Sequence, residues 1–268
     1  MNSLNSKEKK AKLDFKSPVI SAVITMLVLV LVFGISNTNF FKLNNLTTIL
    51  LNASVIGIYA SGITMVLISG GIDLSTAATS AVAVMLMGML YQNGVPIIAG
   101  IIIGIIAAGI LGFINGILIA VVHLPPLMVT IAGQLVYRAL AQALTNTLTI
   151  TIASEGFSKF GRMYILGIPI SVFYMIAFMI VMNYVLKHTA FGRRVFAVGG
   201  NMQASFYSGI NIQKTQLAIY TIMGVISGFA GMVAAAQSAA AAPTTMTARE
   251  FDFISPCFFH RRYCDEWW

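Results

Sequence analysis

Few residues in this sequence have the chemistry of a catalytic or metal site. The three histidines are His123, His188 and His260, and none belongs to the H-E-x-x-H motif of a metalloprotease. The two cysteines, Cys257 and Cys264, flank His260 at a spacing that matches no zinc pattern. The P-loop pattern G-x-x-x-x-G-K-[ST] does not occur. We therefore expect no catalytic residue, metal or cofactor, and energy for work would come from an ion gradient or a separate protein.

Asp73 and Arg138 are the two ionisable residues that lie within the long apolar stretches of the chain. Charged groups are costly at membrane depth, which makes such residues functional candidates. The Asp73 carboxylate can cap the following helix by accepting amide protons, or it can handle a substrate or a proton. Arg138 can extend to the outer interface, pair with an acid, or line a pathway. No Asp or Glu lies in the middle of a span, which argues against a proton-coupled carrier.

The composition determines the class of protein. The 268 residues are 58% apolar and 9% charged, with a mean hydropathy of +0.87. A soluble domain carries about 25% charged residues, and a disordered chain is poor in apolar ones. A membrane β-barrel would show alternating segments rather than continuous apolar runs. The sequence therefore predicts an all-α fold, a polytopic transmembrane helical bundle, and the net charge of +8 reflects basic cytoplasmic loops rather than nucleic-acid binding.

Seven apolar stretches are long enough to cross a bilayer as helices, for which about 20 residues are needed. They lie near Val19–Ile35, Ile49–Ser69, Leu74–Tyr91, Pro96–Leu118, Leu127–Asn146, Ile168–Leu186 and Gln216–Ala236. The first resembles a signal peptide, but no A-x-A-like cleavage site follows it and six more spans do. We therefore interpret it as a retained first helix.

Basic residues set the predicted orientation, because cytoplasmic loops carry an excess of Lys and Arg. Five lysines lie within the first sixteen residues, in the N-terminal segment 1–18. If this segment is cytoplasmic, seven crossings also place the loop 187–215 in the cytoplasm, and that loop contains Arg193 and Arg194 but no acid. The loop 147–167 then lies on the outer side.

Small residues recur at four-residue spacing in several spans. The stripes consist of Gly100, Gly104, Ala108, Gly112 and Gly116, then Ala53, Gly57 and Ser61, and then Gly224 and Gly228 with Gly231 and Ala235 beside them. Such stripes allow helix backbones to approach closely inside a membrane. Bundle packing explains them, and so does a face that slides during transport.

The loop 187–215 is too long to be a simple turn. Asn201 follows Gly199 and Gly200 and is placed to cap a short helix over Met202–Ser208, which Gly209 would end. Such a helix can dock onto a soluble partner or lie on the lipid surface as an interfacial helix. Composition favours neither role.

Three segments resemble, in order, the permease subunits of ribose-type sugar ABC importers. The run SGGIDLSTAATSAVA at 69–83 resembles the family signature GGIDLSVG. The next resemblance is NGILIAVVHLPPLMVTIAGQLVYRALAQALT at 115–145. The third is TAFGRRVFAVGGNMQASFYSGINIQKTQ at 189–216, similar to the family's cytoplasmic segment that contacts the ATPase. As an ordered set covering most of the chain, these motifs are specific.

The resemblance implies a permease domain at 1–254 in the bacterial inner membrane, with 187–215 as its coupling loop. It implies transport of a simple sugar, or of a related furanosyl molecule such as autoinducer-2, by a subunit that is not itself an enzyme. The implied partners are ATP-binding cassette subunits, a second permease chain, a periplasmic substrate-binding protein, the sugar and membrane lipid.

Two groups of residues match the family's functional segments. The signature residues near the membrane are Gly70, Gly71, Asp73, Ser75, Asn115, Gly116, Pro125, Thr130 and Arg138. The residues of the segment that couples to the ATPase are Gly199, Gly200, Asn201, Ala204, Ser208, Gly209 and Ile210.

The chain departs from the family in two places. Ala139 follows Arg138 where the family has Gly, and the tail SPCFFHRRYCDEWW is unlike the family's continuation. A reading frame shifted by one base lets His260–Trp268 encode Ile-Gly-Gly-Thr-Ala-Met-Ser-Gly-Gly, which matches that continuation. We therefore interpret 255–268 as an out-of-frame tail, and we expect transport by the truncated chain to be impaired.

Two other functions remain open on the sequence alone. The first is a secondary carrier or channel that works by itself, and such a carrier usually places ionisable groups in mid-span, whereas an importer permease needs a docking helix. The second is a non-transporting remnant, which co-purification of an ATPase would distinguish from a permease.

The predicted orientation can be tested by thiol labelling of intact cells in a background without Cys257 and Cys264. We expect an impermeant reagent to label Ser158→Cys, in the outer loop, and to leave Ser6→Cys unlabelled until the cells are opened. Strong labelling at position 6 in intact cells would contradict the orientation.

Overall fold

The computed structural model describes residues 18–254. The chain consists of two units, 1–46 and 47–268. The N-terminal lysines and the tail with Cys257, His260 and Cys264 lie outside the described residues. In the first unit, helix α1 (Pro18–Ser36) is followed by a turn. The turn is stabilised by stacking of Phe33 on Phe40 and by a hydrogen bond from Asn45 Nδ2 to the Phe40 carbonyl.

The seven predicted spans all correspond to helices. After α1 they are α2 (Leu43–Ile68), α3 (Thr76–Gln92), α4 (Ile97–Ala120), α5 (Pro126–Ala143), α7 (Ile170–His188) and α10 (Ile212–Ser238). By length and composition, α2, α4, α7 and α10 qualify as membrane-spanning helices in the described part of the chain. Val23–Ser36 and α3 are apolar but shorter. The all-α polytopic prediction is confirmed.

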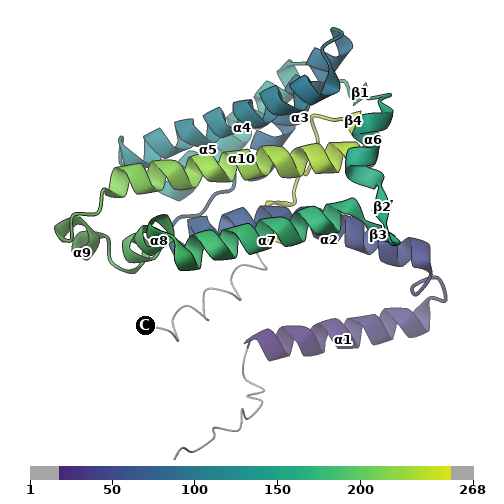
Figure 1. Cartoon of the computed structure of the whole chain (residues 1–268), viewed down its shortest axis with the longest axis horizontal. Helices are drawn as coiled ribbons and strands as arrows, with labels where there is room; N and C mark the ends of the chain where they lie inside the picture. The colour runs from purple at the N-terminus through teal and green to yellow at the C-terminus, as the bar shows by residue number, and fades with distance from the viewer. Residues whose placement is uncertain (1–17, 255–268) are drawn as a thin grey trace, which may run out of the picture. The chain divides into compact units, whose positions relative to one another are not determined.

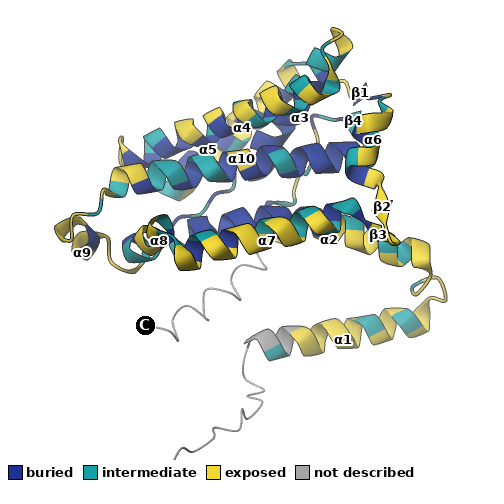
Figure 2. Ribbon diagram, in the orientation of Figure 1, coloured by how far each residue is buried: buried dark blue, intermediate teal, exposed yellow. Residues whose placement is uncertain are grey.

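Helix α3 is buried along most of its length, whereas α4 and α7 carry many exposed residues (Figure 2). Its residues are mostly Ala, Ser, Thr and Met, so three neighbouring helices, α4, α5 and α10, can pack closely around it. The outward faces of α4 and α7 carry exposed Ile, Phe and Met side chains. This distribution is typical of a membrane bundle, in which lipid rather than water covers the outer face.

The most extensive helix contact in the described part of the chain joins α4 and α10 through their small-residue stripes. A Cβ atom on Gly112 would lie 3.0 Å from the Gly224 Cα, and a Cβ on Gly228 would lie 2.7 Å from the Ala108 side chain. The two backbones can approach this closely only because Gly112, Gly224 and Gly228 have no side chain. The stripes on α4 and α10 therefore form a packing face, as one of the two sequence interpretations stated.

Short elements cover one end of the second unit (Figure 1). Strand β1 (Ile150–Thr151) pairs with β4 (Ala240–Ala241), and β2 (Tyr164–Ile165) pairs with β3 (Ile168–Pro169). Helix α6 (Glu155–Arg162) lies between them in sequence. At the other end, α7 and α10 are joined by α8 (Ala190–Gly200) and α9 (Met202–Tyr207).

The chain after α10 turns back onto the bundle. From β4 it turns back, and a helical stretch at 250–254 brings Phe253 onto the ring of Tyr59 in α2, with ring centroids 4.0 Å apart. Glu250, Phe253 and Ile254 are all buried. The segment 239–254 is thus part of the core, because its acid and its aromatic ring find partners there.

The α4–α10 contact can be tested with two glycine-to-alanine variants. Gly224→Ala places a Cβ against the Ala108 carbonyl and the Gly112 backbone, and overpacking of this kind costs about 1–3 kcal/mol. We expect a lower melting temperature for the detergent-solubilised chain. Gly156→Ala on α6 is the control, because its Cβ would meet only the Ser154 hydroxyl, 4.0 Å away. Equal melting temperatures for the two variants would contradict the close contact.

Candidate functional site

A buried chain of hydrogen bonds begins at the loop between α2 and α3. Tyr137 donates its hydroxyl proton to Asn115 Oδ1 at 2.7 Å, and Asn115 Nδ2 donates to Ser75 Oγ at 2.9 Å. Ser75 in turn donates both its hydroxyl and its backbone N–H to Asp73 Oδ1, at 2.7 and 2.8 Å. Every donor in the series points toward the carboxylate, so each hydrogen bond polarises the next.

The loop geometry explains why Asp73 can enter the interior. Gly70 ends the preceding helix with a φ of +85°, a conformation that costs glycine little. The carbonyl of Ile72 accepts a hydrogen bond from Thr130 Oγ1 of α5 at 3.2 Å. Asp73 itself is 3% exposed. Its carboxylate accepts the amide proton of Ser75, the N-cap residue of α3, and within the described residues no hydrogen bond links it to an amide of the helix itself. Asp73 therefore fixes the residue before the helix and does not cap the helix directly.

The structure brings several of the predicted signature residues together at the start of α3. Asp73, Ser75 and Asn115 are joined directly, and Thr130 donates to the carbonyl of Ile72, the residue before Asp73. Gly116 packs against Leu217 of α10. Gly71 and Pro125 lie in the loops that lead into α3 and α5. These signature residues thus lie around the start of α3, whereas Arg138 belongs to a separate network. Their roles in transport are a proposal.

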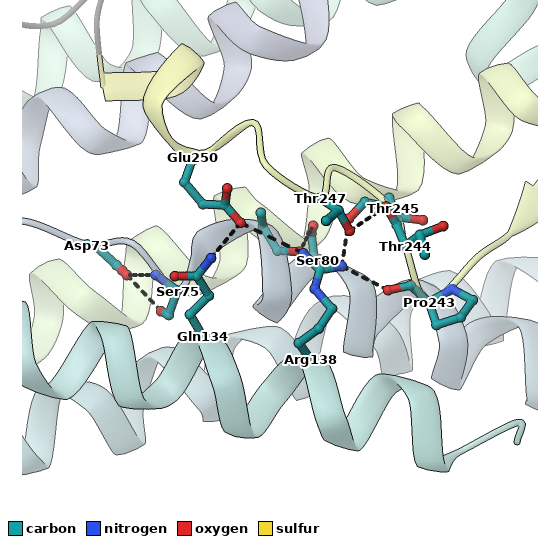
Figure 3. A network of polar contacts seen from close by, with 11 residues as sticks. Asp73, Ser75, Ser80, Gln134, Arg138, Pro243, Thr244, Thr245, Thr247 and Glu250 are labelled. Carbon is teal, nitrogen blue, oxygen red and sulfur yellow. Dashed lines mark hydrogen bonds and ion pairs between the residues drawn. The ribbon is translucent and has the colours of Figure 1, made fainter. Parts of the chain in front are cut away.

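Arg138 has partners that the sequence interpretation did not identify. Its Nη1 donates to the backbone carbonyls of Pro243 and Thr245, at 2.8 and 3.0 Å, and its Nη2 lies 3.9 Å from Glu250 Oε1 (Figure 3). Gln134, one turn earlier on α5, donates from Nε2 to the same Glu250 oxygen at 2.9 Å. Arg138 therefore pairs with an acid, one of the three possibilities considered for it.

Glu250 is the functional candidate that the sequence reading missed. It is 4% exposed and lies in the segment that follows α10. Arg138 was the residue that could have pointed to Glu250, because a guanidinium inside an apolar bundle requires an acid or several carbonyls nearby. The sequence could not show which acid this is, because Glu250 lies far from α5 along the chain. Gln134, which also bonds to Glu250, is 116 residues away from it.

The predicted coupling segment has the expected shape. Asn201 Oδ1 accepts the backbone N–H of Ala204 at 2.9 Å, which caps α9, and Gly209 follows the helix with a φ of +79°. Phe206 and Tyr207 on this helix are 67% and 86% exposed. The short capped helix is confirmed, and it presents two large apolar side chains at one end of the unit.

The polar and charged groups inside the bundle gather in two networks, one around Asp73 and one around Arg138. Within residues 18–254, no group of three or more His, Cys, Asp or Glu side chains is placed to hold a metal ion. Asp73 is bonded to neutral donors only, and the charges of Arg138 and Glu250 balance each other. The interior is therefore polar along two networks and carries little net charge.

Comparisons with known proteins agree with this geometry. The model of a family described as the branched-chain amino acid transport system permease component matches residues 45–257. The chain is similar to the ribose import permease protein of Bacillus subtilis, with 33% identity over 94% of this chain and 79% of that protein. It is 31% identical to the L-arabinose ABC transporter permease protein of Azospirillum brasilense, over 88% of this chain and 69% of that protein.

A third similar protein is the D-allose transport system permease protein of Escherichia coli. It is 31% identical over 81% of this chain and 67% of that protein. No solved structure matches the chain.

The buried ion pair makes a prediction about stability. Removing one partner of such a pair leaves an uncompensated charge and costs about 3 kcal/mol. We expect Glu250→Gln to lower the melting temperature markedly in the original chain, and much less when Arg138→Gln is already present. Lys159→Gln, which breaks the exposed Glu155–Lys159 pair of α6, should change stability by only about 0.3–0.5 kcal/mol. Strictly additive effects of the two buried substitutions would show that the pair does not interact.

Proposed function

This chain belongs to the family of branched-chain amino acid transport system permease components, and on that premise we propose that it is the membrane subunit of an ATP-binding-cassette importer for a simple sugar. The observation that supports the cargo class most strongly is the set of similar proteins, which are named for ribose, L-arabinose and D-allose. Hydrolysis of ATP is the task of separate ATPase subunits, in keeping with a chain that has no P-loop.

The proposed complex contains two permease chains, ATP-binding cassette subunits and a periplasmic substrate-binding protein. The N-terminus and the loop 187–215 lie on the cytoplasmic side in this proposal, and the end with β1–β4 and α6 lies on the periplasmic side. The basic loop supports this orientation, because it contains Arg193 and Arg194 and no acid.

We propose that α9 and the residues around it bind the ATPase. The segment comprises Gly199, Gly200, Asn201, Ala204, Ser208, Gly209 and Ile210. Its helix is capped at both ends, so it is held in a defined shape before any partner binds. Large exposed aromatic residues often carry most of the binding energy in an interface, and Phe206 and Tyr207 are such residues on this helix.

Helix α8 provides a physical connection from this surface to the buried site. A Cβ on Gly199 would overlap the carbonyl of Ile68, so the end of α8 lies directly against the end of α2. The loop that carries Asp73 begins at the next residue, Ser69. If the ATPase displaces α9 and α8, the movement is passed to the Asp73 loop through this tight backbone contact. The contact therefore offers a physical route for coupling between the two sites.

The docking proposal is tested by co-purification of the ATPase subunits with the tagged chain. We expect the double variant Phe206→Ala/Tyr207→Ala to lower the apparent affinity about tenfold or more, which corresponds to roughly 1.4 kcal/mol. Both side chains are exposed, so the variant should keep the melting temperature of the original chain.

Tyr164→Ala is the matched control, because Tyr164 is an exposed tyrosine on β2 at the opposite end of the unit. This variant should bind the ATPase as the original chain does. Unchanged binding by the Phe206/Tyr207 variant would contradict docking through α9. A failure of the original chain itself to retain any ATPase would contradict the proposed function.

A further inference from the structure

Two buried polar atoms without hydrogen-bond partners lie close to the Glu250 carboxylate. They are the hydroxyl of Tyr59 and Nη2 of Arg138, from a total of five such atoms among residues 18–254. Tyr59 is 0% exposed, and its ring is stacked on Phe253, which lies in the same short helical stretch as Glu250. Buried polar atoms are normally hydrogen-bonded, so two exceptions in one place require a physical reason.

The same cluster has unused capacity to accept hydrogen bonds. The contacts of Glu250 with Gln134 and Arg138 both fall on Oε1, whereas a carboxylate can accept about four hydrogen bonds. Gln134 donates from its amide nitrogen, and its own carbonyl oxygen is an acceptor. A ligand that both donates and accepts could therefore bind to all these groups.

The charge balance of the cluster restricts the ligand. Arg138 carries one positive charge and Glu250 one negative charge, and they already face each other. A phosphorylated ligand would add about two negative charges in a buried place whose cation is already neutralised. An uncharged ligand with several hydroxyl groups imposes no such cost.

An aromatic surface borders these polar groups. The rings of Tyr59 and Phe253 are stacked with an interplanar angle of 10°, and both are fully buried. Ligand sites commonly combine an apolar aromatic wall with a small number of polar groups that fix orientation. A compact ring with hydroxyl groups at its edge fits this combination.

The segment that closes the cluster is held in a strained shape. Ala239, Met246 and Ala248 have φ values of 54°, 56° and 63°, a left-handed conformation that is uncommon for residues other than glycine. Such residues persist where the surrounding contacts over-determine them. Here the contacts are the two hydrogen bonds from Arg138 to the carbonyls of Pro243 and Thr245 (Figure 3). Hydroxyl groups that compete for Arg138 would release the segment.

We propose that Tyr59, Gln134, Arg138 and Glu250 form a transit site for an uncharged, hydroxyl-rich cargo. The cargo hydroxyls bond to the Tyr59 hydroxyl, Arg138 Nη2 and the Glu250 carboxylate, and the ring packs near the Tyr59–Phe253 pair. The inference deepens the proposed function and rests on it, because it concerns the place where a sugar is held within the same subunit.

The test uses the purified 268-residue chain in detergent and follows its melting temperature with added D-ribose or D-ribose 5-phosphate. A ligand that binds the folded state raises this temperature with a saturable concentration dependence. We expect D-ribose to give a saturable rise of roughly 5 °C well above its Kd, and D-ribose 5-phosphate to give none. Tyr59→Phe should abolish most of the rise, and Gln134→Ala should reduce it.

Tyr220→Phe is the matched control. Tyr220 is also a buried tyrosine whose hydroxyl has no hydrogen-bond partner, but it lies on α10 near Gly71, outside the cluster. This variant should keep the full D-ribose effect. Without ligand, Tyr59→Phe should melt no lower than the original chain, because the removed hydroxyl makes no internal hydrogen bond.

Three results would overturn the proposal: no saturable effect of D-ribose, an equal effect of D-ribose 5-phosphate, or a full D-ribose effect in Tyr59→Phe. A chain that retains its ATPase but shows one of these results would refute the transit site and leave the importer subunit standing. A chain that retains no ATPase would refute the importer subunit itself.

Discussion

The backbone contact between α4 and α10 determines how the rest of the bundle can be built. Gly112 and Gly224 face each other, and no side chain separates the two helices at that point. In a membrane there is little hydrophobic force between helices, so close packing of this kind must supply much of the association energy. The contact also leaves α3 enclosed by α4, α5 and α10, which explains why small residues fill its sequence. A helix enclosed in this way is a rigid support for the polar loop that precedes it.

Close packing excludes water, and polar groups inside the bundle must then find partners within the protein. The chain meets this requirement in two different ways. Asp73 receives hydrogen bonds from a series of neutral donors that ends at Tyr137, whereas Arg138 combines an acid with two backbone carbonyls. The first arrangement is satisfied among the contacts shown, and the second leaves Nη2 without a hydrogen bond. This difference is why the transit site is assigned to the cluster around Arg138.

Local features could be predicted from the sequence, whereas contacts between distant segments could not. The cap at Asn201 and the end at Gly209 depend on residues a few positions apart, and both are present. The apolar runs predicted seven helices, and the glycine spacing predicted a packing face. The partner of Arg138 depends on how a strained segment after α10 turns back, which is determined by tertiary contacts rather than by local preference. Apolar periodicity could not reveal Glu250, because the surrounding residues are neither continuously apolar nor part of a long helix.

The return of the segment 239–254 into the bundle is most directly tested by thiol cross-linking in membranes, in a background without Cys257 and Cys264. Gln134→Cys/Glu250→Cys should cross-link readily with a short bifunctional reagent, because the two native side chains are hydrogen-bonded at 2.9 Å. Gln134→Cys/Phe251→Cys is the control, since the Phe251 side chain is exposed and the Glu250 side chain is buried. We predict efficient intramolecular cross-linking of the 134/250 pair and little of the 134/251 pair. Absence of cross-linking in the first pair, or equal cross-linking in both, would contradict the placement of Glu250 beside α5.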